Sequence, residues 1–165
     1  MEVIRIGVFV CNCGSNIAGF LNCKDIAEYS KSLPNVVFTR ENLFSCSEAG
    51  VTDIKNAIVE NKLNRVVVAA CTPRTHEPTF RASCEEAGMN PFQFEFVNIR
   101  EHCSWAHKAE TDLATKKAKD LIRMGVARAA LLEPQKSIVA SVEPTALVVG
   151  GGIAGMTAAL SIADH

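Results

Sequence analysis

The sequence predicts an α/β fold in which helices cover both faces of a parallel sheet. Two observations support this prediction. Short apolar runs rich in β-branched residues alternate with amphipathic stretches, and Arg65–Ala70 is apolar throughout after its first residue. A strand that is buried on both faces has this pattern. The alternation β-α-β-α-β-α-β-α over residues 1–132 therefore indicates a three-layer, Rossmann-like sandwich with right-handed crossovers.

The limits of each element follow from periodicity, caps and breakers. Asn22 and Pro34 bracket the first helix, Ser45 and Glu48 have capping-box spacing before the second, and Pro78 suits the first turn of the third. The predicted strands are Ile4–Val10, Val36–Arg40, Arg65–Ala70 and Phe92–Val97. The predicted helices are Lys24–Leu33, a helix after Glu48 with Val51, Ile54 and Ile58 inward, Pro78–Ala87, and a long helix from about Ser104 to Leu132.

A second, incomplete domain is expected after a linker at residues 133–145. Ala146–Val149 resembles a strand, Gly150, Gly152 and Gly155 form G-x-G-x-x-G, and Met156–Ala163 resembles a helix. This arrangement indicates the first β-α unit of a dinucleotide-binding domain, with the pyrophosphate at the helix N-terminus. The acidic residue expected about 20 residues further on would fall beyond residue 165, so residues 146–165 are interpreted as a truncated FAD-binding start that binds no dinucleotide alone. A glycine-rich turn packed on the sandwich is the alternative.

Charge and hydropathy exclude several function classes. The 17 Lys and Arg residues nearly balance 18 Asp and Glu residues, which argues against a nucleic-acid partner. No apolar run reaches the roughly 20 residues that span a bilayer, and the N-terminus lacks the features of a signal peptide, so we expect a cytoplasmic protein without membrane insertion. No Ser-His-Asp order, carboxylate pair or H-E-x-x-H motif supports hydrolytic catalysis.

The seven cysteines are many for a domain that already has enough core to fold. Because strand ends of a parallel sheet meet at its carboxyl edge, a thiol after each strand is brought to one place. Helix N-termini at that edge favour a negatively charged centre, which suits thiolate ligation of an iron–sulfur cluster. We expect four ligands from the five cysteines at strand ends, namely Cys11, Cys13, Cys46, Cys71 and Cys103.

The other two cysteines are weaker candidates. Cys84 lies in mid-helix on the face of Phe80, and Cys23 follows no strand. On this basis Cys71→Ala or Cys103→Ala is expected to abolish cluster binding, whereas Cys23→Ala is not.

Three alternatives to a cluster remain open on spacing alone. Four thiolates also suit zinc. A thiol such as Cys71 could act in redox or persulfide chemistry if helix N-termini lower its pKa. The sandwich could also serve as a subunit-docking module without a cluster.

Charged and aromatic residues near the thiols have two interpretations each. Arg74 and Arg100 could offset cluster charge or pair with Glu77 and Glu101. Histidines could tune a cluster or carry protons, although capping loops is the simpler role; they are His76, His102 and His107. Trp105 is interpreted as a packing residue.

Four segments together resemble the N-terminal region of the A subunit of heterodisulfide reductase and its relatives. They are Cys11-Asn12-Cys13-Gly14, Cys71-Thr72-Pro73-Arg74-Thr75-His76-Glu77-Pro78, Asn98-Ile99-Arg100-Glu101-His102-Cys103-Ser104-Trp105 and the glycine loop from Gly150. The resemblance covers essentially the whole chain, and the two longer cysteine segments are specific to the family.

The resemblance implies part of an oxidoreductase, an iron–sulfur flavoprotein in which a cluster domain precedes a thioredoxin-reductase-like FAD domain and ferredoxin modules. Members in methanogens reduce the CoM-S-S-CoB disulfide through partner subunits, with flavin-based electron bifurcation in the flavoprotein itself. It therefore implies a [4Fe-4S] cluster and FAD as cofactors, with other reductase subunits and an electron-donating hydrogenase or dehydrogenase as partners, and a homodimer is compatible with it. The positions that match the family's cysteines are Cys11, Cys13, Cys46, Cys71, Cys84 and Cys103.

Overall fold

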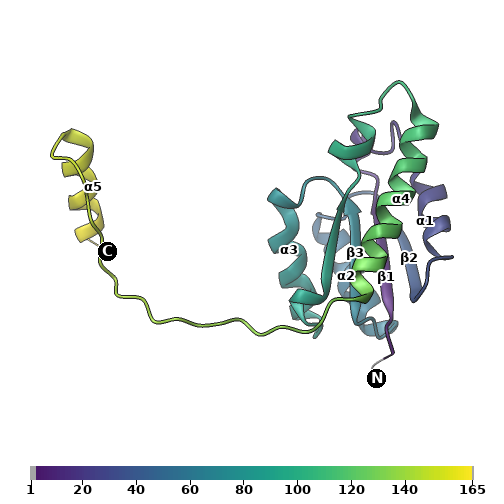
Figure 1. Ribbon diagram of the computed structural model, residues 1–165, viewed down its shortest axis with the longest axis horizontal. Helices are drawn as coiled ribbons and strands as arrows, with labels where there is room; N and C mark the ends of the chain where they lie inside the picture. Colours follow the sequence, from purple (N-terminus) through teal and green to yellow (C-terminus); the bar gives the residue numbers. More distant parts are fainter. Residues whose placement is uncertain (1–2, 165) are drawn as a thin grey trace. The chain divides into compact units, whose positions relative to one another are not determined.

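The computed structural model describes residues 3–164 and divides the chain into two compact units, Met1–Gln135 and Lys136–His165. The first unit is a four-stranded, all-parallel sheet with strand order β2-β1-β3-β4 and helices on both faces (Figure 1). The predicted α/β fold is confirmed. The strands are β1 (Ile6–Cys11), β2 (Val36–Asn42), β3 (Arg65–Ala70) and β4 (Phe94–Asn98), and the helices of this unit are α1 (Cys23–Ser30), α2 (Glu48–Glu60), α3 (Pro73–Glu86) and α4 (Thr111–Ala130).

Two apolar cores lie on opposite faces of the sheet. Alternate side chains of β1 contribute to each, since Val8 packs in the core with α1 and α4 while Phe9 packs in the core with α2 and α3. Both are fully buried. Gly125 lets α4 approach the sheet closely, because a Cβ there would collide with the Val97 side chain of β4. The two cores fix the sheet in place, so the loops at its carboxyl edge start from rigid positions.

Helix α2 begins later than its capping-box spacing predicts. The side chain of Ser47, not Ser45, caps it by accepting the N–H of Gly50 at 3.2 Å. Ser45 is fully buried before the helix, and its Oγ has no hydrogen-bond partner. Cys46 therefore lies in the loop just before the helix, with its position relative to the strand as predicted.

Helix α3 begins earlier than predicted. Thr72 caps it and Pro73 takes the first turn, while Pro78 lies inside the helix. A proline suits the first turn of a helix, because the N–H that it lacks would have no partner there. Pro73 directly follows a capping residue, Thr72, whereas Pro78 follows no such residue. Cys71 is consequently two residues from a helix N-terminus instead of being followed by a long loop.

The long helix predicted from Ser104 is shorter than expected. A five-residue π-helical turn, Arg100–Ser104, comes first, and α4 starts only at Thr111. The Ser104 hydroxyl donates to the carbonyl of Asn16 at 2.7 Å, which ties this turn to the short 3₁₀ turn Gly14–Asn16 after β1. π-helical turns are rare and are frequent at functional sites. Helical periodicity does not distinguish them from the start of an α-helix.

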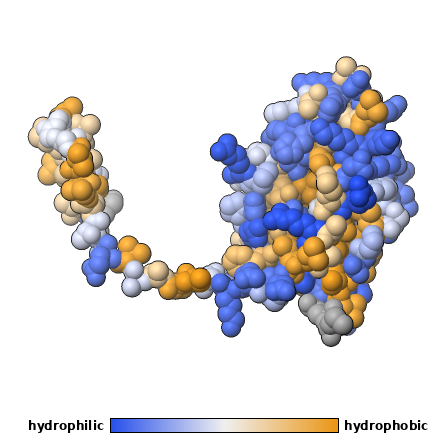
Figure 2. Space-filling view, viewed as in Figure 1, coloured by the Kyte–Doolittle hydropathy of each residue, from blue (hydrophilic) through white to orange (hydrophobic). Residues whose placement is uncertain are grey.

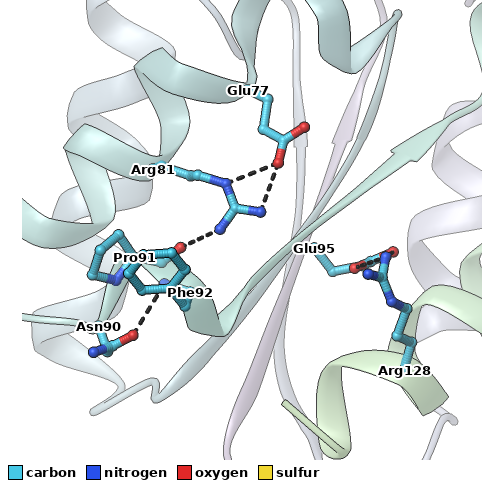
Figure 3. Close-up of polar contacts among 7 residues, drawn as sticks. All are labelled: Glu77, Arg81, Asn90, Pro91, Phe92, Glu95 and Arg128. Carbon is cyan, nitrogen blue, oxygen red and sulfur yellow. Dashed lines mark hydrogen bonds and ion pairs between the residues drawn. The ribbon is translucent and has the colours of Figure 1, made fainter. Parts of the chain in front are cut away.

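Strand β4 lies at one edge of the sheet, and one of its charged side chains, Glu95, is buried. The carboxylate of Glu95 is nearly buried and receives both bonds from Arg128 Nη1, at 2.8 and 2.9 Å (Figure 3). Burial raises the pKa of Glu95, although Arg128 opposes this. Near the same strand, Arg81 of α3 joins Glu77 to the carbonyl of Pro91 (Figure 3). These contacts hold α3 and α4 against the edge strand.

The second unit contains the glycine loop and α5 (Ile153–Ala163). Within the described residues Ala146–Val149 pairs with no strand, so the strand predicted there is absent, because a single extended segment has no ladder of its own. Gly150 has φ 111°, which needs glycine, and a Cβ on Gly155 would collide with the Gly150 carbonyl. The tight turn into a helix is present as predicted. Apolar residues are exposed along α5 (Figure 2).

No helix among residues 3–164 is long and apolar enough to cross a membrane.

Candidate metal centre

The ends of β1, β2 and β3 bring four cysteines to the carboxyl edge of the sheet. In the parallel register Cys11 pairs with Asn42 at the end of β2, and Val10 pairs with Ala69 near the end of β3. Cys71 follows β3 directly. The three strands end level with one another. Four cysteines therefore lie at these strand ends or within a few residues of them, at the same edge of the sheet, namely Cys11, Cys13, Cys46 and Cys71.

The backbone of Cys13 is strained. This residue has φ 45° and ψ 40°, in the left-handed region that a β-carbon disfavours, and Gly14 follows with φ 54°. Its N–H donates to the carbonyl of Leu43 at 3.0 Å, which fixes the loop against the end of β2. Cys13 packs partly against both apolar cores. Strain of this kind is concentrated at functional sites, where surrounding structure holds it in place.

Cys46 is brought to Cys11 by the loop between β2 and α2. The backbone N–H of Ser45 donates to Sγ of Cys11 at 3.3 Å. Cys46 is exposed, whereas Cys11 is buried. Burial and then repulsion from Cys11 raise the pKa of Cys46, with a smaller contribution from Cys13. Because Cys46 directly follows Ser45, the contact between the Ser45 N–H and the Cys11 sulfur brings Cys46 close to Cys11.

Cys71 completes the group from the end of β3. Burial raises the pKa of Cys71, charge attraction to Arg100 opposes this, and repulsion from Cys13, Cys46 and Cys11 raises it further. This direction is opposite to the lowered pKa that redox or persulfide chemistry at Cys71 would need, because loss of hydration and repulsion among the thiols outweigh the attraction to Arg100. Four thiolates so placed repel one another, and a cationic centre bound among them relieves that repulsion.

The other three cysteines lie in the apolar cores. Cys103, in the π-helical turn, is fully buried beside α4, Cys84 is fully buried on the α3 face, and Cys23 is buried at the start of α1. Burial raises the pKa to about 12 for Cys23 and Cys84 and to about 11 for Cys103. Cys103 follows a strand, as predicted, but its charge interaction is with Lys117 and not with the four edge thiols.

Unsatisfied polar atoms surround the four edge thiols. One buried oxygen in each of Asn12, Asn42, Ser45 and Glu101 makes no hydrogen bond. Asn12 and Ser45 adjoin edge cysteines in the sequence, Asn42 pairs with Cys11, and Glu101 follows Arg100. Buried polar atoms without a partner are uncommon and indicate a functional or ligand-binding position. Of these atoms only the Ser45 hydroxyl can donate a hydrogen bond to sulfur, and together with the soft thiol donors it suits a cluster at this edge.

Across residues 3–164 no three His, Cys, Asp or Glu side chains are grouped closely enough to hold a metal ion. Zinc bonds of about 2.3 Å would require the four sulfurs to converge on a point. A [4Fe-4S] cube is larger and spaces its thiolates more widely.

Sequence reasoning missed two contributors to this edge. The capping-box spacing assigns Ser45 to a helix cap, yet its N–H contacts the Cys11 sulfur. Trp105, interpreted from the sequence as a packing residue, is 44% exposed and lies against the Arg100 guanidinium at 4.6 Å. No local signal identifies an amide donor to sulfur. The pair Arg100 and Trp105 is visible at i, i+5 spacing only once a π-helical turn is known.

No family model matches the chain. Comparison with curated proteins shows strong similarity over almost all of it. The chain is 56% identical over 163 residues to an iron–sulfur A subunit, numbered 2, of the CoB–CoM heterodisulfide reductase of Methanopyrus kandleri, covering 99% of this chain and 25% of the relative. The chain belongs to the family of heterodisulfide reductase A subunits. The resemblance to heterodisulfide reductase A subunits is thereby confirmed.

Other members of the family show the same coverage. Identity is 54% over 164 residues to the A subunit of the H₂:CoB–CoM heterodisulfide, ferredoxin reductase of Methanothermobacter marburgensis, covering 99% of this chain and 25% of that protein. It is 53% over 163 residues to a protein of Archaeoglobus profundus named as similar to the heterodisulfide reductase A subunit, covering 99% and 23%. The chain thus spans about a quarter of the length of the curated relatives it matches.

Proposed function

We propose that the Met1–Gln135 unit binds a [4Fe-4S] cluster through Cys11, Cys13, Cys46 and Cys71 and serves in electron transfer. The observation that carries this proposal is that four cysteines lie at or just after the carboxyl ends of three adjacent strands, where the Ser45 N–H already contacts the Cys11 sulfur. When bound, such a cluster accepts and releases one electron at a time. The words "iron-sulfur" in the name of the Methanopyrus relative support this assignment.

The surrounding residues prepare this edge for a charged cofactor. The Ser45 N–H already donates to Cys11, and hydrogen bonds to ligand sulfurs are a main determinant of cluster potential. The buried cores exclude water from below, while exposed Cys46 leaves one side open to solvent and to an electron donor or acceptor. Asymmetric exposure gives electrons a preferred side of entry.

Within a longer flavoprotein, the domain would exchange electrons with a flavin. Gly150, Gly152 and Gly155 begin the turn that would hold FAD when the remainder of a dinucleotide-binding domain is present. The names of the relatives support a place in a complex that reduces the CoB–CoM heterodisulfide, and H₂, ferredoxin and F₄₂₀H₂ appear in those names. The partners would be other reductase subunits and an electron-donating hydrogenase or dehydrogenase. Flavin-based bifurcation would then occur outside the described residues, in a cytoplasmic assembly.

The test is the iron and acid-labile sulfide content of the chain after purification without oxygen, followed by EPR after dithionite reduction. The expected result is about four iron and four sulfide per chain and a signal from a reduced cluster. Zinc without iron, or no metal after attempted reconstitution, would contradict the proposal. The matched variant pair is Cys71→Ala at the edge and Cys103→Ala in the core.

A further inference from the structure

Arg100 is brought to the thiol edge by an extension of the strand ladder. The N–H of Ile99 donates to the carbonyl of Ala70 at 2.8 Å, so pairing between β3 and β4 continues one residue beyond β4. Cys71 follows Ala70 and Arg100 follows Ile99, both just beyond the ends of the two strands. The backbone from which the Arg100 side chain extends therefore lies close to Cys71.

The π-helical turn fixes the Arg100 side chain on two sides. The N–H of Trp105 closes on the Arg100 carbonyl at 2.9 Å and places the indole under the guanidinium, 4.6 Å from carbon to ring centre. Nε and Nη2 of Arg100 donate to one oxygen of Glu101 at 3.1 and 2.8 Å. The side chain is only 20% exposed. A long side chain held in this way has lost most of its freedom before any ligand arrives.

The charge of Arg100 acts on the edge thiols. Burial lowers the pKa of Arg100, but Glu101 and then the sulfurs of Cys71 and Cys13, the latter through a hydrogen bond, raise it by more. In return Arg100 opposes the rise in the pKa of Cys71 and, as the smallest contribution, the rise in the pKa of Cys46. Glu101 neutralises part of this charge through the one oxygen that accepts both bonds. Its other oxygen, Oε2, is buried without a hydrogen-bond partner, so the ion pair has one fixed orientation.

We propose that Arg100, held against Trp105, is a positioning residue that raises the reduction potential of the centre on Cys11, Cys13, Cys46 and Cys71. This inference rests on the function proposed for these four thiols. Adding one electron from dithionite adds one negative charge beside a fixed cation, which stabilises the reduced state more than the oxidised state. Arginine suits the role because its planar fork stacks on an aromatic ring and stays charged.

The experiment compares Arg100→Met, Arg100→Lys and the control Arg74→Met in the full chain, purified without oxygen. Arg74 also lies close to Cys71 in sequence, but it is exposed at the start of α3. Iron and sulfide content and the midpoint potential from an EPR-monitored titration are measured for each. Arg100→Met is expected to keep its iron and to lower the equilibrium constant for reduction at least tenfold, equivalent to about 59 mV for one electron.

Arg100→Lys keeps the charge without the stacked fork and is expected to shift less than Arg100→Met. Arg74→Met is expected to change the equilibrium constant by less than about twofold, because its charge is screened by water. Equal shifts in the two Met variants would reduce the effect to net charge and overturn the proposal. An unchanged potential in Arg100→Met would also overturn it, as would loss of iron in both Arg100 variants, which would assign Arg100 to assembly. Failure of the wild-type chain to bind iron is a separate result that contradicts the proposed function itself.

Discussion

The cysteines at the carboxyl edge and those in the cores have the same chemistry but different surroundings. Cys11, Cys13, Cys46 and Cys71 lie at or after strand ends near an arginine, in a region where the backbone is strained and polar atoms lack partners. Cys84 and Cys103 pack among apolar side chains, and burial raises the pKa of each. Cys23 is also buried, but its Sγ lies 4.0 Å from the carbonyl oxygen of Cys11, and Cys11 contributes to its raised pKa after burial and Glu41. Following a strand is therefore insufficient to keep a cysteine out of the apolar core, as Cys103 shows.

The largest expected effect is on iron binding. Cys71→Ala should reduce iron from about four per chain to near zero, because a cube missing one of four thiolates is poorly held. Cys103→Ala should keep the iron, since Cys103 lies in the core beside α4. This outcome reverses the expectation from sequence, in which both variants lose the cluster. Iron and sulfide assays on both variants, with Cys23→Ala as a further control, check it.

If Cys103→Ala loses iron while remaining folded by circular dichroism, the division between edge and core is contradicted at this residue.

A second difference is expected in thiol reactivity of the iron-free chain. Exposed Cys46 should react with iodoacetamide long before Cys84 and Cys103, which are fully buried. Because its pKa is raised, the rate at Cys46 should climb about tenfold per pH unit through pH 9 and not level off below it. Peptide mass spectrometry after timed labelling gives the rate for each cysteine. Modification of Cys84 at a rate close to that of Cys46 would show that the core opens readily.

The smallest expected effect is on the free energy of unfolding, and here the core cysteine matters more than the edge cysteine. Cys84→Ser should destabilise the iron-free chain by about 1–3 kcal/mol, because it buries a hydroxyl group among apolar side chains. Cys46→Ser, the matched control, should change stability by less than about 0.5 kcal/mol because the residue is exposed. Urea unfolding of the two variants and the wild type measures both. Equal losses would remove the distinction between the two environments.

The fold was predictable because the hydrophobic periodicity and the positions of caps and breakers agree over most of the chain. The strand predicted at Arg65–Ala70 coincides with β3, and Asn22 caps α1 as predicted, accepting the N–H of Asp25. Errors occurred at starts of helices. Two serines and two prolines offered alternative caps and first turns, and the choice among them depends on where the preceding strand ends.

The site was predictable as an edge, but its membership was not. Strand ends indicated where thiols would gather, yet Cys103 follows β4 through a π-helical turn that directs it into the core. That turn has no sequence pattern of its own. The role of Ser45 depends on a backbone N–H, which every residue except proline provides, so no residue type could reveal it.

The ion pair between Glu95 and Arg128 has a consequence for how the chain behaves in concentrated solution. Strand β4 offers a row of unpaired backbone groups to any extended segment, which is the usual starting point for sheets that grow from molecule to molecule. A new strand laid on this edge would have to strip water from Arg128, which is 69% exposed, and crowd the charged pair near the start of β4. The pair therefore protects the chain against aggregation through this edge, independently of any cofactor.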